Sequence, residues 1–281
     1  MPHLWLNGRL LPADAARIDP ADRGLLLGDG LFETMRAVGG RVPLLARHLA
    51  RLRDGAALLG IPVPYADEEL GAAAGELLRA NGLAAGAVRL TLTRGPAPRG
   101  LLPPAEPMPT ALMAAFPPAS ASPPLRAVVA TLARRDEGSP LSRVKALGYL
   151  GSILALREAL ARGADEALLL NTQGRLACAT TANVFLVTAD GGELVTPPLG
   201  EGVLPGTTRA SALELAPRLG LGAREAALTP GDLASAAEVF VTSSQRLLTP
   251  VVEVEGRPVG TGVPGTVAER FLAALLEAAG A

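Results

Sequence analysis

Lysine is almost absent from this chain. Lys145 is its only lysine, and the other 25 of its 26 basic side chains are arginine. A guanidinium stays protonated and is a poor nucleophile, whereas a desolvated amine can lose its proton and attack a carbonyl group. The sequence therefore marks Lys145 as a candidate for Schiff-base chemistry. The alternative is a surface lysine left by chance in an arginine-rich composition.

Cysteine and histidine are equally scarce. The single Cys178 excludes an internal disulfide framework and fits a reducing compartment. Two histidines, His3 and His48, leave little material for a histidine-based metal site or a Ser-His-Asp relay. The composition thus argues against a zinc enzyme or a serine hydrolase, and we expect no metal.

The chain also lacks a charge excess and long apolar runs. Its formal net charge is -1, which gives no electrostatic footprint for nucleic acid. No apolar run approaches the roughly 20 residues of a membrane span, and the first ten residues do not read as a signal peptide. We expect a cytoplasmic protein with no nucleic-acid or membrane partner.

The order of expected elements indicates two domains. Helix and strand patterns interleave in both halves, which predicts a mixed α and β (α+β) protein. Residues 118–124 contain three closely spaced prolines and read as a linker. We expect a small N-terminal α/β domain over residues 1–117 and a larger, cofactor-binding C-terminal domain over residues 125–281.

Apolar periodicity and the placement of glycine give the expected elements. A hairpin should turn at Gly39 and Gly40, and Asp67 should cap a helix. Helices are expected at about residues 46–59, 67–80, 149–161, 208–219 and 263–279, and strands at about 87–94, 166–170, 183–188 and 238–242.

Seven segments along the chain carry a family resemblance. In order they are DRGLLLGDGLFETMR, RHLARL, TRGPAPRG, SPLSRVKALGYLGS, ATTANVFLV, GVLPGTTR and VFVTSSQRLLTPV. With them the chain resembles the class IV (fold-type IV) enzymes that use pyridoxal 5'-phosphate (PLP). These include branched-chain and D-amino acid aminotransferases, (R)-selective amine transaminases and aminodeoxychorismate lyases. The resemblance implies a two-domain fold-type IV enzyme, a PLP cofactor and a homodimer.

The resemblance assigns the cofactor-binding residues. Lys145 would hold PLP as a Schiff base and then act as general base and acid. Arg51 matches the arginine that grips the PLP phosphate, for which a planar fork is suited; taken alone, it reads as a solvated helix residue. Leu204, Thr207 and Thr208 open a helix, where unpaired backbone N–H groups favour an anion, although Thr207 also reads as a simple N-cap. Ser243 and Ser244 match further phosphate donors.

The substrate side is implied by three residues. Arg99 lies in TRGPAPRG, a loop of the kind that holds a substrate carboxylate, and the RGxxxRG spacing is closer to the lyase pattern. The histidine usual in D-amino acid enzymes is replaced by Leu101. Phe32 and Glu33 match the strand that lines the substrate pocket, but Glu33 shares a strand face with Leu31 and equally suits a structural pairing with an arginine.

Cys178 is the main departure from the family. It stands five residues before the asparagine of ANVF, where most relatives have a glutamate that pairs with the pyridine nitrogen of PLP. A carboxylate keeps that nitrogen protonated and strengthens the electron sink, whereas a thiol is a weak, normally neutral partner. The alternative is an ordinary buried thiol, displaced by one position in the alignment.

These features lead us to expect a transaminase that transfers an amino group from an amino acid or small amine to a 2-oxo acid. A 4-amino-4-deoxychorismate lyase, which gives 4-aminobenzoate and pyruvate, is the alternative that RGxxxRG and Cys178 support. A non-catalytic PLP-binding relative remains a further alternative.

Overall fold

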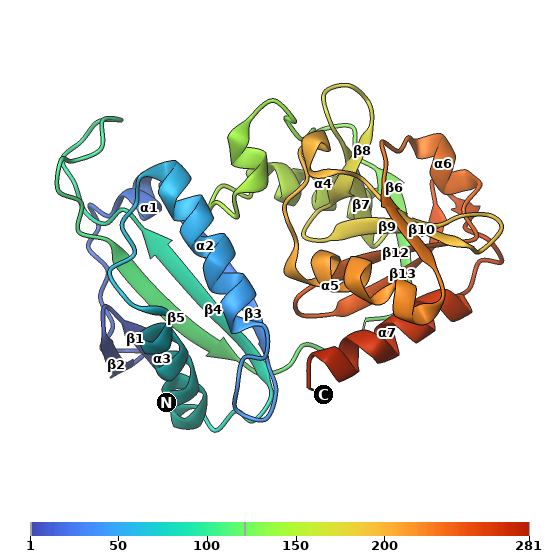
Figure 1. Ribbon diagram of the computed structural model, residues 1–281. Helices are drawn as coiled ribbons and strands as arrows, with labels where there is room; N and C mark the ends of the chain where they lie inside the picture. The colour runs from blue at the N-terminus through green and yellow to red at the C-terminus, as the bar shows by residue number, and fades with distance from the viewer. Residues whose placement is uncertain (1, 121, 281) are drawn as a thin grey trace. The chain divides into compact units, whose positions relative to one another are not determined.

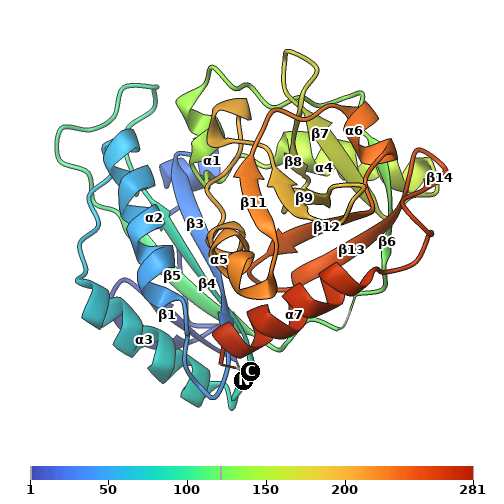
Figure 2. The ribbon, with the colours of Figure 1, turned by 45° about the vertical axis from the view of Figure 1, so that its right-hand side comes forward.

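The computed structural model describes residues 2–120 and 122–280. The chain forms two compact units (Figures 1 and 2). The first unit runs to Ala119 and also contains Val144–Gly148, and the second contains Ser120–Arg143 and Tyr149–Ala279. The change of unit at Ala119 falls within the expected linker, of which residue 121 lies outside the described residues.

The first unit is a sheet with two helices on one face. Its five strands pair antiparallel in the order β2-β1-β5-β4-β3, and α2 and α3 cover one face of the sheet (Figures 1 and 2). Leu31 and Met35 of β3 pack there against Leu49 and Leu52 of α2 in one core. The elements are β1 (His3–Leu6), β2 (Arg9–Pro12), α1 (Arg23–Leu27), β3 (Gly30–Ala37), α2 (Leu45–Leu59), α3 (Asp67–Ala80), β4 (Gly86–Thr93) and β5 (Thr110–Phe116).

The segment that carries Lys145 belongs to this first unit. Its backbone runs along the edge strand β3, where Phe32 N donates to Lys145 O at 2.9 Å and Leu147 N donates to Gly30 O at 3.0 Å. This differs from the expected division, which placed all of residues 125–281 in the second domain. The physical reason is that β3 is the last strand of the sheet, and its outer backbone groups need partners.

The second unit is built on a nine-stranded sheet. The order is β11-β10-β9-β12-β13-β6-β7-β8, with β14 paired to β13. The end strand β8 leads directly into β9 and contacts it, so the sheet curls back on itself. The strands are β6 (Leu125–Val129), β7 (Glu166–Leu170), β8 (Leu176–Ala179), β9 (Asn183–Val187), β10 (Glu193–Thr196), β11 (Gly222–Glu225), β12 (Glu238–Ser243), β13 (Leu247–Val254) and β14 (Arg257–Pro258).

Helices pack on this sheet, and their packing fixes the position of the first turn of α5. The helices are η1 (Pro140–Arg143), α4 (Leu150–Ala161), η2 (Leu199–Glu201), α5 (Thr207–Leu215), η3 (Pro217–Leu219), α6 (Pro230–Ala234) and α7 (Thr266–Ala278). Phe185, Phe240 and Phe271 join β9, β12 and α7 in a core that also contains Ala212 of α5. Because α5 packs on this core, its first turn at Thr207 is held rigidly beside the end of β12.

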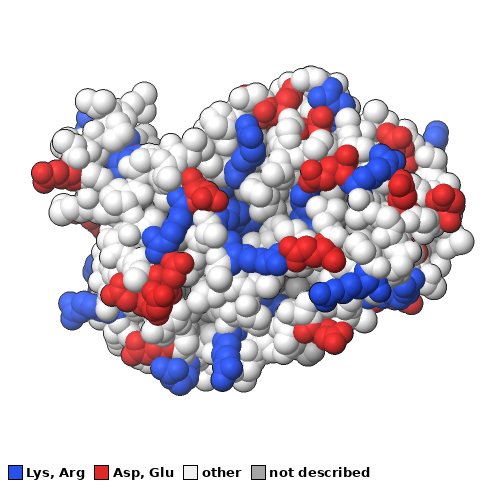
Figure 3. All heavy atoms as spheres, viewed as in Figure 1, with Lys and Arg blue, Asp and Glu red and all other residues white. Residues whose placement is uncertain are grey.

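The surface carries both signs of charge. Acidic and basic side chains are interspersed over the face seen in Figure 3, in keeping with the formal net charge of -1. No helix among the described residues is long and apolar enough to cross a membrane. In the same residues, no three His, Cys, Asp or Glu side chains gather as metal ligands would.

Candidate active site

Glu33 and Arg51 form a buried ion pair between β3 and α2. Arg51 Nε donates to Glu33 Oε1 at 2.8 Å, and a second guanidinium nitrogen donates to Oε2 at 2.6 Å. His48 Nδ1, one turn earlier on α2, lies 2.6 Å from the same Oε2. Burial by itself would raise the pKa of Glu33, but the hydrogen bonds from His48 and Arg51 outweigh it and hold that pKa below its usual range. Glu33 is therefore an ionised carboxylate without exposure to water.

This pairing is the structural role for Glu33 that the sequence left open. Leu31, Glu33 and Met35 share the strand face covered by α2, as their alternation predicted. The pairing also shows that Arg51 does not lie on a solvated helix face: its side chain is 10% exposed and joined to a buried carboxylate. The guanidinium is held by one edge, which fixes its orientation.

Lys145 lies beside this pair and over an aromatic ring. Its Nζ is 4.5 Å from the centroid of the Phe32 ring, and the Arg89 guanidinium carbon is 3.7 Å from the same centroid. A ring face attracts a cation within about 6 Å of its centroid. Phe32 thus holds two basic side chains near each other, one of them the only amine in the chain's sequence apart from the N-terminus.

The surroundings of Lys145 favour its neutral amine. Burial lowers the pKa of Lys145 most, the Arg51 charge lowers it further, and the Arg89 charge adds to this, with the Glu33 carboxylate opposing; the result is about 8. A neutral amine is the nucleophilic form of lysine. At pH values around 8 a substantial fraction of Lys145 is therefore able to attack a carbonyl group.

The second unit offers an anion site at the start of α5. Gly206 is the N-cap and provides no side chain, so the first backbone N–H groups have no capping side chain. The Thr208 hydroxyl is buried and has no hydrogen-bond partner, and the Thr207 hydroxyl lies 3.2 Å from that of Ser244, which follows β12. Backbone N–H groups and the Thr208 hydroxyl at the positive end of a nine-residue helix suit a phosphate group.

Two contacts preform this cradle. Asn183 of β9 donates its amide to Leu204 O at 3.0 Å, and a Cβ added at Gly206 would lie 2.0 Å from Asn183 Oδ1. The close approach explains glycine at position 206. The alternative interpretation of Thr207 as the N-cap is wrong, because Gly206 is the cap and Thr207 is the first residue of α5. Ser243 ends β12 next to Ser244.

Cys178 is half-buried in β8 in a largely apolar setting. It packs against the cluster formed by residues of β6, β7 and α4, including Val128, Ala155 and Leu169. Burial raises the pKa of Cys178, the Arg135 charge opposes this, and the Glu166 carboxylate raises it further. The thiol is therefore neutral at ordinary pH.

The structure places Arg99 in the first unit. It is exposed on the loop between β4 and β5, whereas Arg94, the first arginine of RGxxxRG, is buried and pairs with Asp29 at 2.8 Å. The first half of that motif thus serves the fold. Within the first unit the structure brings together Lys145, Arg51, Phe32 and Glu33, and within the second it brings together Thr207, Thr208, Ser243 and Ser244.

Two residues of the site were missed by the sequence analysis. His48 was counted only as one of two histidines, and Arg89 was read only as part of an apolar strand. The signal for Arg89 was present in the alternation of β4, where Arg89, Thr91 and Thr93 alternate with Leu90 and Leu92. For His48 the signal was its place three residues before Arg51 on one face of a helix.

The chain is similar to proteins of known class over almost its full length. Residues 30–254 match the model of the family described as amino-transferase class IV. A putative branched-chain-amino-acid aminotransferase of Methanocaldococcus jannaschii is 36% identical over 95% of this chain and 93% of its own length. A D-alanine aminotransferase of Bacillus licheniformis is 31% identical over 96% of this chain and 94% of its own length.

Solved structures give the same likeness in three dimensions. The Escherichia coli branched-chain amino acid aminotransferase superposes with a TM-score of 0.93 at 30% identity, covering 98% of this chain and 94% of that one. A putative 4-amino-4-deoxychorismate lyase of Legionella pneumophila gives a TM-score of 0.87 at 29% identity, covering 95% and 97%. The fold is thus that of the class IV enzymes.

Proposed function

The chain belongs to the class IV aminotransferase family, and we propose that it uses PLP to carry an amino group from an amino acid to a 2-oxo acid. The observation that carries the proposal is Lys145, the only lysine, whose buried amine has a pKa of about 8 beside Phe32 and the Glu33–Arg51 pair. No guanidinium performs this chemistry, so an amine retained among 25 arginines fits a covalent role.

The donor groups present fit PLP. We assign its phosphate to the start of α5, where Thr208 has a buried hydroxyl without a partner and Thr207 and Ser244 face each other. Arg51 is a further phosphate ligand in this proposal, and Leu204 and Ser243 complete the cradle. When bound, PLP supplies an electron sink for the carbon next to the amino group.

Lys145 performs two tasks in the proposed reaction. Its neutral amine, which the depressed pKa makes available near pH 8, would hold PLP by condensing with the cofactor's aldehyde with loss of water. Released from the cofactor by an incoming amino acid, the same Nζ would serve as the base for the Cα proton of the substrate and as the acid that returns this proton. The Glu33–Arg51–His48 group fixes the orientation of Arg51 throughout.

The proposed substrates are an amino acid and a 2-oxo acid, with branched-chain L-amino acids as the first donors. Two of the similar proteins are named as branched-chain amino acid aminotransferases, one of them as putative. Arg99 is proposed to bind the substrate carboxylate, since a guanidinium matches it with two parallel hydrogen bonds. Phe32, which holds Arg89 over its ring, is proposed to line the side-chain pocket.

A half-reaction panel tests the proposal. Holoprotein is mixed with single amino acids of both hands, including valine, leucine and D-alanine, and the cofactor absorbance is followed in one turnover. A transaminase converts the yellow form to the pyridoxamine form and is restored by pyruvate or 2-oxoglutarate. Protein that binds PLP and stays unchanged with every amine would be a non-catalytic relative. Lys145→Arg, which keeps the charge, is the control and should be inactive.

A lyase acting on 4-amino-4-deoxychorismate is the second candidate. Cys178 supports it: its thiol is neutral, and the family resemblance implies that it stands where most relatives have a glutamate for the pyridine nitrogen. A weaker electron sink suits an elimination that is driven by formation of an aromatic product. Release of pyruvate and 4-aminobenzoate from this substrate, with no half-reaction for any amino acid, would favour the lyase.

A homodimer stays a prediction of the family resemblance.

A further inference from the structure

The loop between β4 and β5 carries Arg99 and is locked at its stem. The buried Asp22 carboxylate accepts hydrogen bonds from Thr93 Oγ1 at 2.9 Å and Thr110 Oγ1 at 2.6 Å, one residue on each side of the loop. Gly95 has φ +85°, and a Cβ added there would lie 1.7 Å from Met108 O. The two ends of the loop are therefore fixed to each other and to the start of α1.

The tip of the loop depends on one side chain. Arg23 donates one hydrogen bond to Gly100 O at 2.9 Å and another to Leu101 O at 3.0 Å, the two carbonyls that follow Arg99. Among the described residues, no other hydrogen bond holds residues 98–104. Leu101 and Leu102 are 82% and 87% exposed and supply no packing within the first unit. In the part of the chain that the structure describes, Arg23 is therefore the only hydrogen-bond donor that fixes the backbone next to Arg99.

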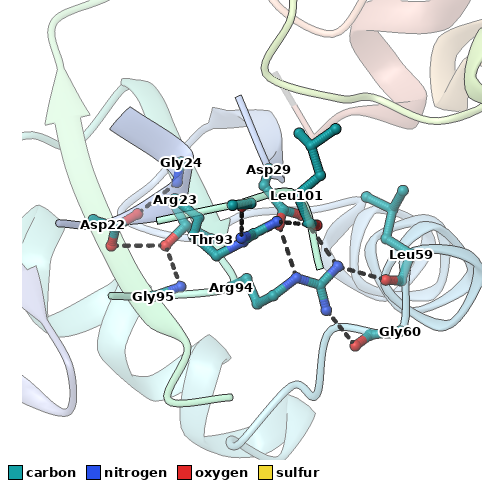
Figure 4. Close-up of polar contacts among 11 residues, drawn as sticks. Asp22, Arg23, Gly24, Asp29, Leu59, Gly60, Thr93, Arg94, Gly95 and Leu101 are labelled. Carbon is teal, nitrogen blue, oxygen red and sulfur yellow. Dashed lines mark hydrogen bonds and ion pairs between the residues drawn. The ribbon is translucent and has the colours of Figure 1, made fainter. Parts of the chain in front are cut away.

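Arg23 is itself rigid, because a carboxylate holds it from behind. Its Nε donates to Asp29 Oδ2 at 2.7 Å, and only 4% of Arg23 is exposed (Figure 4). Burial would raise the pKa of Asp29, but the hydrogen bonds and charges of Arg94 and Arg23 outweigh it and keep that pKa below its usual range. The anchor is thus a charged pair, which makes stronger hydrogen bonds than neutral groups do.

Asp29 also holds a second arginine with a different task. Arg94 donates to both Asp29 oxygens, at 2.8 and 3.1 Å, and its other hydrogen bonds go to Leu59 O at 2.7 Å and Gly60 O at 2.8 Å, where α2 ends (Figure 4). The two arginines share one carboxylate, yet Arg94 fixes the end of a helix and Arg23 fixes the loop tip. Arg94 is therefore a matched control for Arg23.

We propose that Arg23 is a positioning residue for substrate binding: by holding the carbonyls of Gly100 and Leu101 it sets where the Arg99 guanidinium can reach. The inference rests on the proposed role of Arg99 as the carboxylate ligand. An exposed arginine whose backbone also moves must be ordered anew at each binding event, and this cost falls on substrate affinity. Loss of the tether thus raises KM and leaves the chemical step unchanged.

The test compares Arg23→Met with Arg94→Met in the holoenzyme. Each variant leaves Asp29 one arginine partner, so neither strands the carboxylate. Arg23→Met should raise KM for the amino acid about tenfold, equivalent to about 1.4 kcal/mol, with kcat changed by less than about twofold. Amide hydrogen exchange in residues 98–104 should accelerate, and PLP affinity should not change. Arg94→Met should lower thermal stability and leave KM unchanged. Arg23→Lys, which keeps a charged donor, should recover part of the affinity.

Arg99→Met separates this proposal from the proposed function. If Arg99→Met leaves KM unchanged, the assignment of Arg99 is wrong and the role of Arg23 falls with it. If Arg99→Met raises KM while Arg23→Met changes neither KM nor loop exchange, only the tether is wrong. An equal rise of KM in Arg23→Met and Arg94→Met would also overturn the proposal, because it would mark a general loss of structure. In the Arg99→Met background, Arg23→Met should have no further effect on KM.

Discussion

Three charged neighbours set the state of Lys145 at the scale of single residues. Arg51 and Arg89 lower its pKa and Glu33 raises it, on top of the effect of burial. Lys145 is thus a poised amine whose neutral fraction depends on side chains from β3, α2 and β4. The sequence alone identified Lys145 by its scarcity. The alternation of β4 puts Arg89 on the polar face of that strand, but only the pairing of β3 with β4 brings Arg89 onto the Phe32 ring.

The pH dependence of PLP capture tests this view of Lys145. Neutral amine is the reacting form, so the rate at which apoprotein binds PLP covalently should rise as pH increases through about 8. Removal of a neighbouring positive charge raises the pKa of an amine, so Arg89→Leu should shift this profile to higher pH. Arg79→Leu, at an exposed position of α3, changes net charge equally and should leave the profile in place. Equal shifts in both variants would mean that Arg89 does not act locally.

Cys178 determines a second residue-scale prediction. Cys178→Glu should let the pyridine nitrogen keep its proton and speed the single-turnover half-reaction with an amino acid. The larger side chain enters a packed apolar cluster, and its charge lies near the Glu166 carboxylate. A loss of stability of roughly 1 to 3 kcal/mol is therefore expected. Glutamine has about the size of glutamate without its charge. Cys178→Gln should therefore show the same loss of stability but no faster half-reaction. A folded Cys178→Glu variant that binds PLP and reacts no faster would show that Cys178 is not the electronic switch.

At the scale of elements, α2 and β3 are coupled through the buried contacts of Glu33 with Arg51 and His48. Arg51→Ala would strand the Glu33 carboxylate with His48 alone, and removal of one partner of a buried pair costs about 3 to 5 kcal/mol of stability. Arg51→Ala should also weaken PLP binding by about 2 to 4 kcal/mol, as expected for a lost charge-assisted contact.

The double variant Arg51→Ala with Glu33→Gln separates these two effects. It removes the stranded charge, so unfolding in denaturant should show a partial recovery of stability relative to Arg51→Ala. The loss of PLP affinity should persist, because the phosphate ligand is still missing. Recovery of both quantities together would return Arg51 to a purely structural role.

The start of α5 is the second element-scale test. Thr208→Val removes a buried hydroxyl that has no protein partner, so the thermal stability of the apoprotein should be unchanged or higher. PLP affinity should fall about tenfold if that hydroxyl donates to the phosphate, a loss of about 1.4 kcal/mol. Ser211→Ala, one turn further along α5, removes a hydroxyl that donates to Thr207 O and should leave PLP affinity unchanged. Equal PLP titrations for Thr208→Val and the parent would contradict the assignment.

Element positions were predictable to within a few residues where apolar periodicity was strong. Predicted helices at 67–80 and 149–161 correspond to α3 and α4. The predicted hairpin at Gly39 and Gly40 is reduced to one bridge between Val38 and Arg41, because the full length of β3 pairs with β4 instead. Asp67 is the first residue of α3 and not its cap, which is Ala66, since Asp67 pairs with Arg53. Local sequence cannot reveal such long-range pairing.

At the scale of the whole molecule, the chain divides into two units, each with its own core. The composition of residues 118–124 predicts a linker near the change of unit at Ala119. What sequence order hides is the return of Val144–Gly148 to the sheet of the first unit, where it pairs with β3. The segment supplies backbone partners to an edge strand that lies more than a hundred residues earlier in the chain. No local pattern in the sequence encodes such a pairing.

Reduction with borohydride tests whether Lys145 holds PLP covalently. Holoprotein is reduced, digested and mapped by mass spectrometry. A pyridoxyl group is expected on the peptide that contains Lys145, and Lys145→Arg should lose both this group and the yellow colour. A pyridoxyl group on any other residue, or an unmodified Lys145 in protein that has bound PLP, would contradict it.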